Sequence, residues 1–279
     1  MGYIDCKAVR DEILNEVKSR NPGNLKLVII QVEGDDASEV YVRNKVKTAE
    51  SVGIECKVVK CSKDIDYIGL WKIIYHYSNR LGVTGLMLQL PLPDHLKKYE
   101  QRLLDTIPWY MDVDGLSTES AGRLWSDLPC IVPATPGGVM RLLPEDLSGK
   151  HVVVINRSNL IGKPLTKLLL DRNATVSVCH SKTGYLKDYT NTADIVITGI
   201  GKAKYFDGYY PYINQVWIDC GINRDENGKL CGDIDPETWN VNNVYLNREV
   251  TPVPGGVGIL TTAQLMANVL TAYKLQREV

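Results

Sequence analysis

Short apolar runs alternate with amphipathic stretches along the first half of the chain. The run LKLVIIQV is β-branched, short and without polar alternation, which is typical of a strand buried on both faces. Strands are predicted in this way at residues 25–32, 55–61 and 84–90, with helices at 38–53 and 65–80. We expect Ser38 to cap the first helix and Gly53 to follow its end. This alternation implies parallel βαβ units.

The sequence pattern changes near residue 135. After that point the alternation of apolar runs and amphipathic stretches recurs, more clearly than before. Apolar runs predict strands at residues 151–155, 174–179, 193–200 and 215–221. The turn after the first of these strands leads into a helix, with Ser158 or Asn159 as its cap and Pro164 in its first turn. A second parallel sheet is therefore expected.

A final helix is predicted from a capping box of Thr261 and Gln264. Its apolar residues Ala263, Met266 and Leu270 recur at helical spacing, so one face should be buried. We expect this helix to return to the first half of the chain and pack there.

The composition narrows the class of protein. A length of 279 residues exceeds that of most single domains and predicts two. Lys and Arg number 32 against 33 Asp and Glu, and the net charge of −1 argues against a nucleic-acid partner or a polybasic contact with membranes. Apolar residues make up 44% and charged residues 23%, so a globular protein without a membrane span is expected.

The seven cysteines are odd in number and scattered, and they form no CxxC pair. With only four histidines, neither a disulfide framework nor a structural metal site is indicated. The N-terminal stretch is polar and contains no apolar run typical of a secretory signal. A reducing cytoplasm is the expected location.

Residues 151–181 are the first candidate for a dinucleotide site, because a parallel βαβ unit presents a helix N-terminus beside its first turn. The three-glycine fingerprint is missing and only Gly162 remains in that turn, so an ordinary crossover is the alternative. NAD sites usually carry an acid at the end of the second strand. In this sequence the end of the second strand carries no acidic residue. Arg157, Ser181 and Lys182 could receive a 2′-phosphate there, which favours NADP over NAD. The alternative is that they are solvated loop residues.

Three segments of the first half carry further candidate chemistry. Tyr41 and Lys45 lie four residues apart and would share a helix face, although most such pairs are surface contacts. Gln89 interrupts an apolar strand at its carboxyl end, where ligands bind in open α/β sheets. MDVDGL places Asp112 and Asp114 beside a glycine turn, as a plain surface turn also could. Spacing alone does not join these segments into one site.

The segment TPVPGGVG could be a structural connector, or its glycines could let the backbone approach a flat ligand. No nucleophile elbow, Walker A loop or HExxH motif occurs, which removes the commonest hydrolase, NTPase and zinc-protease interpretations.

Eight segments now combine into a family resemblance. In chain order they are YVRNK (41–45), QLPLP (89–93), DVDG (112–115), ATPGG (134–138), RSNLIGKP (157–164), ATVSVCHSKT (174–183), GDID (232–235) and TPVPGGVG (251–258). The set resembles the bifunctional methylenetetrahydrofolate dehydrogenase/methenyltetrahydrofolate cyclohydrolase family from about residue 5 to 272. The resemblance implies an α/β homodimer of two-domain chains, with the active site in the cleft between the domains.

The implied domains are a three-layer α/β folate-binding catalytic domain and a Rossmann-type NADP-binding domain, with the last helix returning to the first. We assign them to residues 1–136 plus 255–279 and to residues 137–254, respectively.

The resemblance also implies roles for individual residues. Tyr41 matches a tyrosine that positions the folate, and Lys45 matches the central catalytic lysine. Gln89 matches a residue that interacts with this lysine, and Asp114 matches the anchor of the pterin. The folate pocket is implied to be lined by the loop that contains Pro254, Gly255 and Gly256.

On the cofactor side, Arg157, Ser158 and Ser181 match residues that hold NADP and its 2′-phosphate. Asn156 stands in the same turn where the family usually has glycine. Gly221 precedes Ile222, which matches a residue beside the nicotinamide.

The implied reactions are oxidation of 5,10-methylenetetrahydrofolate with NADP⁺ and hydrolysis of the methenyl product to 10-formyltetrahydrofolate. Hydride transfer needs orientation more than acid or base, whereas hydrolysis needs water activation and proton transfer. A lysine can serve only if its pKa falls below the usual value of about 10.4. We expect closure of the cleft to lower the pKa of Lys45.

Several positions depart from the family pattern without removing a residue assigned to chemistry: Met111, Leu116-Ser117, Ala134, Asn156 and Ile259-Leu260. Three alternatives to the bifunctional enzyme stay open. The first is a dehydrogenase-only relative with weak cyclohydrolase activity, against which Lys45 and Gln89 argue. The second is a dehydrogenase of the shikimate type, whose own substrate motifs are missing. The third is a non-catalytic sensor that binds NADP or folate.

Overall fold

The computed structural model describes residues 2–210, 214–240 and 249–278. Its contacts divide the chain into two compact units, each made of two segments. One contains residues 12–134 and 262–279, and the other residues 1–11 and 135–261. We call them the three-stranded unit and the six-stranded unit after their main sheets.

The three-stranded unit contains a parallel sheet in the order β3-β2-β4. The strands are β2 (Lys26–Val32), β3 (Glu55–Cys61) and β4 (Gly85–Leu88). The helices that accompany them are α1 (Cys6–Arg20), α2 (Asp36–Ser51), α3 (Tyr67–Ser78), α4 (Asp94–Lys97), α5 (Glu100–Leu104) and α6 (Thr118–Trp125). All three strands lie within two residues of their predicted bounds.

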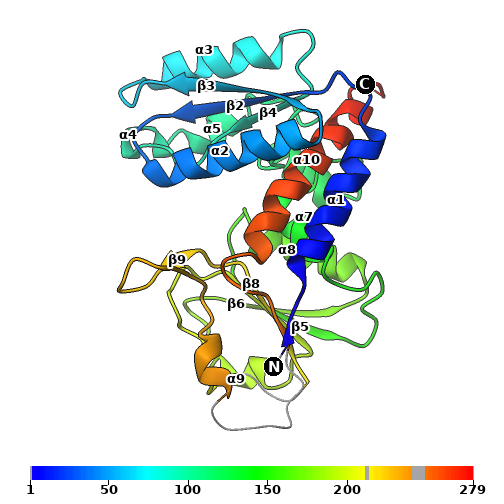
Figure 1. The fold of residues 1–279 in the computed structure, drawn as a ribbon, viewed down its shortest axis with the longest axis vertical. Coiled ribbons are helices and arrows are strands. Elements are labelled where there is room, and N and C mark those ends of the chain that lie inside the picture. The colour runs from blue at the N-terminus through cyan, green and yellow to red at the C-terminus, as the bar shows by residue number, and fades with distance from the viewer. Residues whose placement is uncertain (1, 211–213, 241–248, 279) are drawn as a thin grey trace. The chain divides into compact units, whose positions relative to one another are not determined.

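Alternate residues of the central strand β2 enter two different cores, because successive side chains of a strand point to opposite faces. Leu27 and Ile29 pack with residues of α2 and of the last helix, α10 (Val257–Leu275). Val28 and Ile30 pack with residues of α3 on the other face. Figure 1 shows α3 and α2 on opposite sides of this sheet.

Residues 262–279 lie in the three-stranded unit, as predicted for the last helix. Met266 and Leu270 are buried there, and Asn268 Nδ2 donates hydrogen bonds of 2.8 Å to the carbonyls of Val113 and Val132. The predicted capping box was wrong, because the helix begins one turn earlier, at Val257. The hydroxyl of Thr261 donates to the carbonyl of Val257 inside the first turns.

The start of α2 also differs from its prediction. The helix begins at Asp36, and the cap is the carboxylate of Asp35, which accepts from both the backbone N–H and the hydroxyl of Ser38. Ser38 therefore lies inside the first turn. Gly53 follows the helix with φ of +75°, as expected for its end.

The six-stranded unit contains a parallel sheet in the order β1-β11-β8-β7-β5-β6. The strands are β1 (Gly2–Tyr3), β5 (His151–Ile155), β6 (Thr175–Cys179), β7 (Ile195–Thr198), β8 (Val216–Asp219) and β11 (Glu249–Val250). The other elements are α7 (Ala134–Met140), α8 (Gly162–Asp171), α9 (Lys187–Thr190), a short hairpin of β9 (Asn223–Arg224) and β10 (Leu230–Cys231), and a 3₁₀ turn at Pro236–Asn240.

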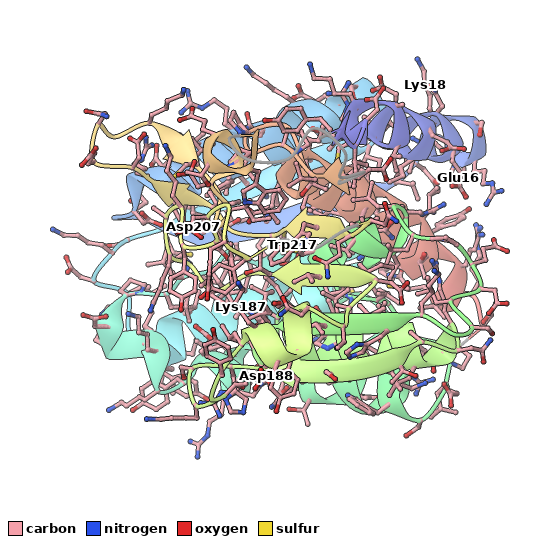
Figure 2. The ribbon with its side chains drawn as sticks, turned by 90° about the horizontal axis from the view of Figure 1, so that it is seen from below. Glu16, Lys18, Lys187, Asp188, Asp207 and Trp217 are labelled. Atoms are coloured by element: carbon pink, nitrogen blue, oxygen red, sulfur yellow. The ribbon has the colours of Figure 1, made fainter. Side chains whose placement is uncertain are left out.

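Two cores cover the faces of this second sheet. Val152 and Val154 pack with residues of α8, whereas Val153 packs with Phe206 and Trp217 on the opposite face. Trp217 is fully buried in this unit, and Figure 2 labels it together with Lys187 of α9. The alternation of β5 thus repeats the arrangement of β2.

The contact division differs from the domain boundaries expected from the sequence. Residues 1–11 and 255–261 group with the six-stranded unit, whereas both were expected with the folate-binding part. The reason at the N-terminus is β1, which pairs in parallel with β11. A strand of two residues leaves no periodicity that a sequence pattern could detect.

None of the described helices combines the length and apolar composition that crossing a bilayer requires.

Candidate active site

Helix α2 carries Tyr41 and Lys45 one turn apart. Tyr41 is 39% exposed, and Lys45 is half-buried. The helix covers the sheet face that contains Leu27 and Ile29. Lys45 extends from this helix to Gln89, which directly follows β4.

Gln89 lies directly after β4 and is the hydrogen-bond partner of this lysine. Lys45 Nζ donates to Gln89 Oε1 at 2.9 Å. The amide of Gln89 is itself held, because its Nε2 donates to the carbonyl of Leu90 at 2.5 Å and its backbone N–H donates to Ile30 at 2.8 Å. The buried glutamine therefore fixes the direction of the ammonium group.

The DVDG segment runs beside β4, with Leu86 bridged to Asp112 in parallel. The buried carboxylate of Asp112 accepts from the N–H of Gly115 at 3.0 Å, the N–H of Ser117 at 2.8 Å and the hydroxyl of Ser120 at 2.9 Å. Burial raises the pKa of Asp112 to about 6, against the effect of these hydrogen bonds. Asp112 therefore stabilises the turn through these hydrogen bonds, whereas Asp114 is the acid of this segment whose charge acts on Lys45.

Lys45 and Asp114 alter each other's protonation. Burial lowers the pKa of Lys45 below its ordinary value, and the charge of Asp114 opposes this shift. Burial raises the pKa of Asp114, and the charge of Lys45 opposes that shift in turn. Burial therefore disfavours the charged form of each group, and each charge stabilises the charged form of the other.

Two sulfur atoms complete the surroundings of Lys45, and neither residue was expected there. Met87 Sδ lies 3.9 Å from Nζ, and the Cys56 thiol, whose pKa burial raises to about 11, is close enough to influence the lysine. Residues paired between parallel strands share a face, and the pairs are Leu27 with Cys56 and Ile29 with Met87. Strand alternation, applied to all three strands together, could have found both residues.

The cofactor candidates lie at the carboxyl ends of strands in the six-stranded unit. Asn156, Arg157 and Ser158 follow β5, and Ser181 and Lys182 follow β6, the strand beside it. Asn156 is partly buried, whereas the other four side chains are exposed. The start of α8 differs from its prediction, because neither Ser158 nor Asn159 is its N-terminal cap.

This edge of the sheet suits a dinucleotide that carries a 2′-phosphate. Residues 179–184 contain no carboxylate, and the consecutive residues Ser181 and Lys182 are both exposed. The turn there is held by the hydroxyl of Thr183, which accepts from the N–H of His180 at 2.8 Å. The exposed guanidinium of Arg157 follows the neighbouring strand. These residues fit NADP better than NAD.

Gly221 and Ile222 follow β8, and two buried aspartates shape their loop. Asp219 accepts from the N–H groups of Gly221 at 2.8 Å and Ile234 at 2.9 Å. Burial raises the pKa of Asp219 to about 7, and the charge of Asp233 adds to the shift. Ile222, by contrast, is 46% exposed, an apolar side chain available to a flat ligand.

The first turn of α10 lies beside this isoleucine, since a Cβ added to Gly258 would lie 3.8 Å from Ile222 Cδ1. The loop that includes Pro254, Gly255 and Gly256 directly precedes this turn, and it belongs with Ile222 to the six-stranded unit. The structure thus forms two groups: Tyr41, Lys45, Gln89 and Asp114 in one unit, and the remaining candidates in the other.

Two family models match the chain. The model for the catalytic domain of tetrahydrofolate dehydrogenase/cyclohydrolase matches residues 4–114, and the model for its NAD(P)-binding domain matches residues 133–277. Together they cover most of the sequence.

Individual relatives agree. The chain is 41% identical over 278 residues to the bifunctional protein FolD of Agathobacter rectalis, covering 98% of each. The crystal structure of the bifunctional FolD enzyme of Campylobacter jejuni matches with a TM-score of 0.91 and 36% identity, covering 98% of each chain. The FolD structure of Trypanosoma brucei, complexed with NADP and an inhibitor, matches with a TM-score of 0.87 and 30% identity over 99% of this chain and 98% of that one. The chain belongs to the tetrahydrofolate dehydrogenase/cyclohydrolase family.

Proposed function

We propose that this protein is a bifunctional enzyme whose central catalytic group is Lys45. It oxidises 5,10-methylenetetrahydrofolate to the methenyl form with NADP⁺ and hydrolyses that product to 10-formyltetrahydrofolate. The observation that carries the role of Lys45 is its 2.9 Å hydrogen bond to Gln89 in a setting that lowers its pKa. A lowered pKa makes the unprotonated amine available, which acid–base catalysis by a lysine requires.

In the hydrolytic step the neutral amine of Lys45 accepts a proton from the water that attacks the methenyl carbon. The resulting ammonium then returns a proton to the ring nitrogen that leaves this carbon. Gln89 accepts from Nζ and keeps the amine directed at the reacting carbon. Because burial lowers the pKa of Lys45, the base form is available at lower pH than for an exposed lysine.

Asp114 anchors the pterin in this proposal. A carboxylate can accept two parallel N–H bonds from the amino-pyrimidine edge of a pterin, which fixes the plane of the ring. Tyr41, one helical turn from Lys45, supplies an aromatic face for the folate. Pro254, Gly255 and Gly256 would line a folate pocket, as the family resemblance implies.

On the cofactor side, Arg157, Ser158 and Ser181 would hold NADP and its 2′-phosphate, and Asn156 would lie beneath the pyrophosphate. Gly221 and Ile222 would face the nicotinamide. When bound, NADP⁺ supplies the hydride acceptor of the first reaction.

A direct assay tests the proposal. The purified protein should reduce NADP⁺ in the presence of methylenetetrahydrofolate, and should separately hydrolyse methenyltetrahydrofolate without any nucleotide. A dehydrogenase-only relative would fail the second assay, and a binding sensor would fail both. Faster turnover with NAD⁺ than with NADP⁺ would overturn the assignment of Arg157 and Ser181.

We further propose a homodimer formed through β6. Among the residues that the structure describes, this strand pairs with β5 on one side only. Its sequence TVSVC carries no charge, and Val178 is 41% exposed. Uncharged, β-branched edge strands readily pair with another chain. Light scattering should give twice the mass of one chain, and Val178→Lys should give monomers. A variant that remains dimeric would show that the interface lies elsewhere.

The cytoplasm is the location we propose. No two of the seven cysteines form a disulfide among the described residues, as in a reducing compartment. Cell fractionation that found the enzyme in an oxidising compartment would contradict this assignment.

A further inference from the structure

The strand order of the six-stranded sheet reverses between β5 and β7. From β5 the chain passes through α8 to β6 on one side, whereas β7 and β8 lie on the other side. Ligands of open α/β sheets bind at such a point, outside the carboxyl ends of the strands. The residues that directly follow β5 and β7 therefore form the floor of the cofactor site.

A single side chain joins these two strand ends. Asn156 follows β5 and Gly199 follows β7, and Asn156 Nδ2 donates to the carbonyl of Gly199 at 2.5 Å. Its Oδ1 accepts from the N–H of Ser158 at 2.7 Å and from the N–H of Gly162, the first residue of α8, at 3.1 Å. One amide thus satisfies three main-chain groups on both sides of the crevice.

The turn closes tightly around this amide. A side chain at Gly162 would collide with the backbone of Asn156, so the first residue of α8 packs directly on the end of β5. The hydroxyl of Ser158 accepts from the N–H of Ile161 at 3.0 Å. Main-chain donors at the start of α8 are therefore occupied by side chains of the turn itself.

The loop after β7 is also held from its other side. The buried carboxylate of Asp233 accepts from the N–H groups of Ile200 at 2.6 Å and Lys202 at 3.0 Å. It also accepts from Asn223 Nδ2 at 2.9 Å, in the loop that follows Ile222. Asn156 and Asp233 therefore fix the segment 199–202 between the β5 turn and the β8 loop.

We propose that Asn156 is a positioning residue for the dinucleotide, acting through the main chain of Gly199 and Gly162. Its amide sets the spacing between the turn that carries Arg157 and Ser158 and the loop beneath the middle of the cofactor. Because Asn156 also occupies N–H groups that a pyrophosphate would otherwise take, affinity depends on exposed side chains presented by a rigid turn. This inference rests on the proposed NADP-binding function.

The variant Asn156→Ala removes all three hydrogen bonds but keeps the Cβ. Asn159→Ala is the matched control, because Asn159 lies in the same turn and its exposed side chain accepts from Lys163 Nζ at 2.7 Å on the surface. NADPH affinity is measured directly by fluorescence titration. Cyclohydrolase activity, which needs no nucleotide, reports whether the rest of the enzyme is intact.

We expect Asn156→Ala to weaken NADPH binding about tenfold and to raise KM for NADP⁺ similarly, with cyclohydrolase kcat unchanged. Asn159→Ala should bind NADPH as the unaltered protein does. Asn156→Ser, which keeps an acceptor for the turn but is too short to reach Gly199, should fall between the two. It also serves as the test if the alanine variant does not fold.

Unchanged or tighter NADPH binding in both Asn156 variants would overturn the inference, as would an equal loss in Asn159→Ala. A parallel fall in cyclohydrolase activity would show general damage in place of positioning, and would also overturn it. If the unaltered protein bound NADPH but had neither activity, the proposed function would fail while this test of Asn156 still stood.

Discussion

The candidate functional side chains of the two units differ in burial. In the three-stranded unit, Lys45 and Asp114 are partly withdrawn from water, and burial shifts both pKa values toward the neutral forms. In the six-stranded unit, Arg157 and Ser181 are exposed, and what is buried is the hydrogen-bonded scaffold beneath them. Proton transfer needs groups whose two forms are close in free energy, whereas anion binding needs permanent charge and fixed geometry. The difference in burial follows this difference in chemistry.

The largest effect should come from Lys45→Met. Removing the amine should lower the cyclohydrolase rate by roughly 10²–10⁴-fold, the usual contribution of a general acid–base group. Separate measurements of methenyl hydrolysis and NADP⁺ reduction should show a smaller loss in the oxidation, which depends on orientation.

Lys47→Met is the control for this variant, because Lys47 is an exposed lysine of the same helix. An equal loss of activity in both variants would contradict the acid–base role of Lys45. Hydrolysis of the methenyl substrate at the normal rate by Lys45→Met would contradict it as well.

A second effect concerns stability and pH in the three-stranded unit. The pKa of Asp112 is about 6 in the folded protein, above its ordinary value of 3.8, so the folded state binds this proton more tightly than the unfolded state. The contribution of Asp112 to stability should therefore increase as pH falls from about 7 to about 4, by roughly 2–3 kcal/mol at most.

Urea unfolding of the unaltered protein and of Asp112→Asn across this range measures the contribution of this carboxyl. The difference between their free energies of unfolding should change with pH in the stated direction. A pH-independent difference would mean that the carboxyl is not shifted by burial.

The smallest effect should come from Ser181→Asp on the exposed cofactor side. A carboxylate at the end of β6 repels a 2′-phosphate and can accept a 2′-hydroxyl, so KM for NADP⁺ should rise roughly tenfold while KM for NAD⁺ falls. Ser181→Ala separates loss of the hydroxyl from gain of the charge. If Asp and Ala gave the same cofactor preference, electrostatics at this position would not decide between the nucleotides.

Much of this arrangement could be predicted from the sequence, because buried parallel strands are long apolar runs. The runs at 25–32 and 151–155 correspond to β2 and β5, and Gln89 at the end of β4 does meet Lys45. That meeting was implied by the family resemblance, since spacing alone could not join residues on separate elements.

The failures have local physical causes. The helices α2, α8 and α10 do not start at their predicted caps. At α2 the physical cause is Asp35, whose carboxylate makes the cap in place of Ser38. The apolar pattern of one strand does not indicate Cys56 or Met87, because the register between the strands decides which residues share the face near Lys45. Asp233 lies within a motif that was recognised, but its hydrogen bonds to the loop after β7 depend on a turn that only the folded chain reveals.

The parallel bridge between β4 and the DVDG segment requires a glycine at residue 85. A Cβ on Gly85, the first residue of β4, would lie 2.5 Å from Val113 Cγ1, so any side chain there would push the segment away from the strand. Val113 directly precedes Asp114, and a shift of the backbone by a fraction of an ångström would be passed on to that carboxylate. Substitutions at Gly85 should therefore disturb the position of Asp114, although Gly85 lies at the opposite end of β4 from Gln89.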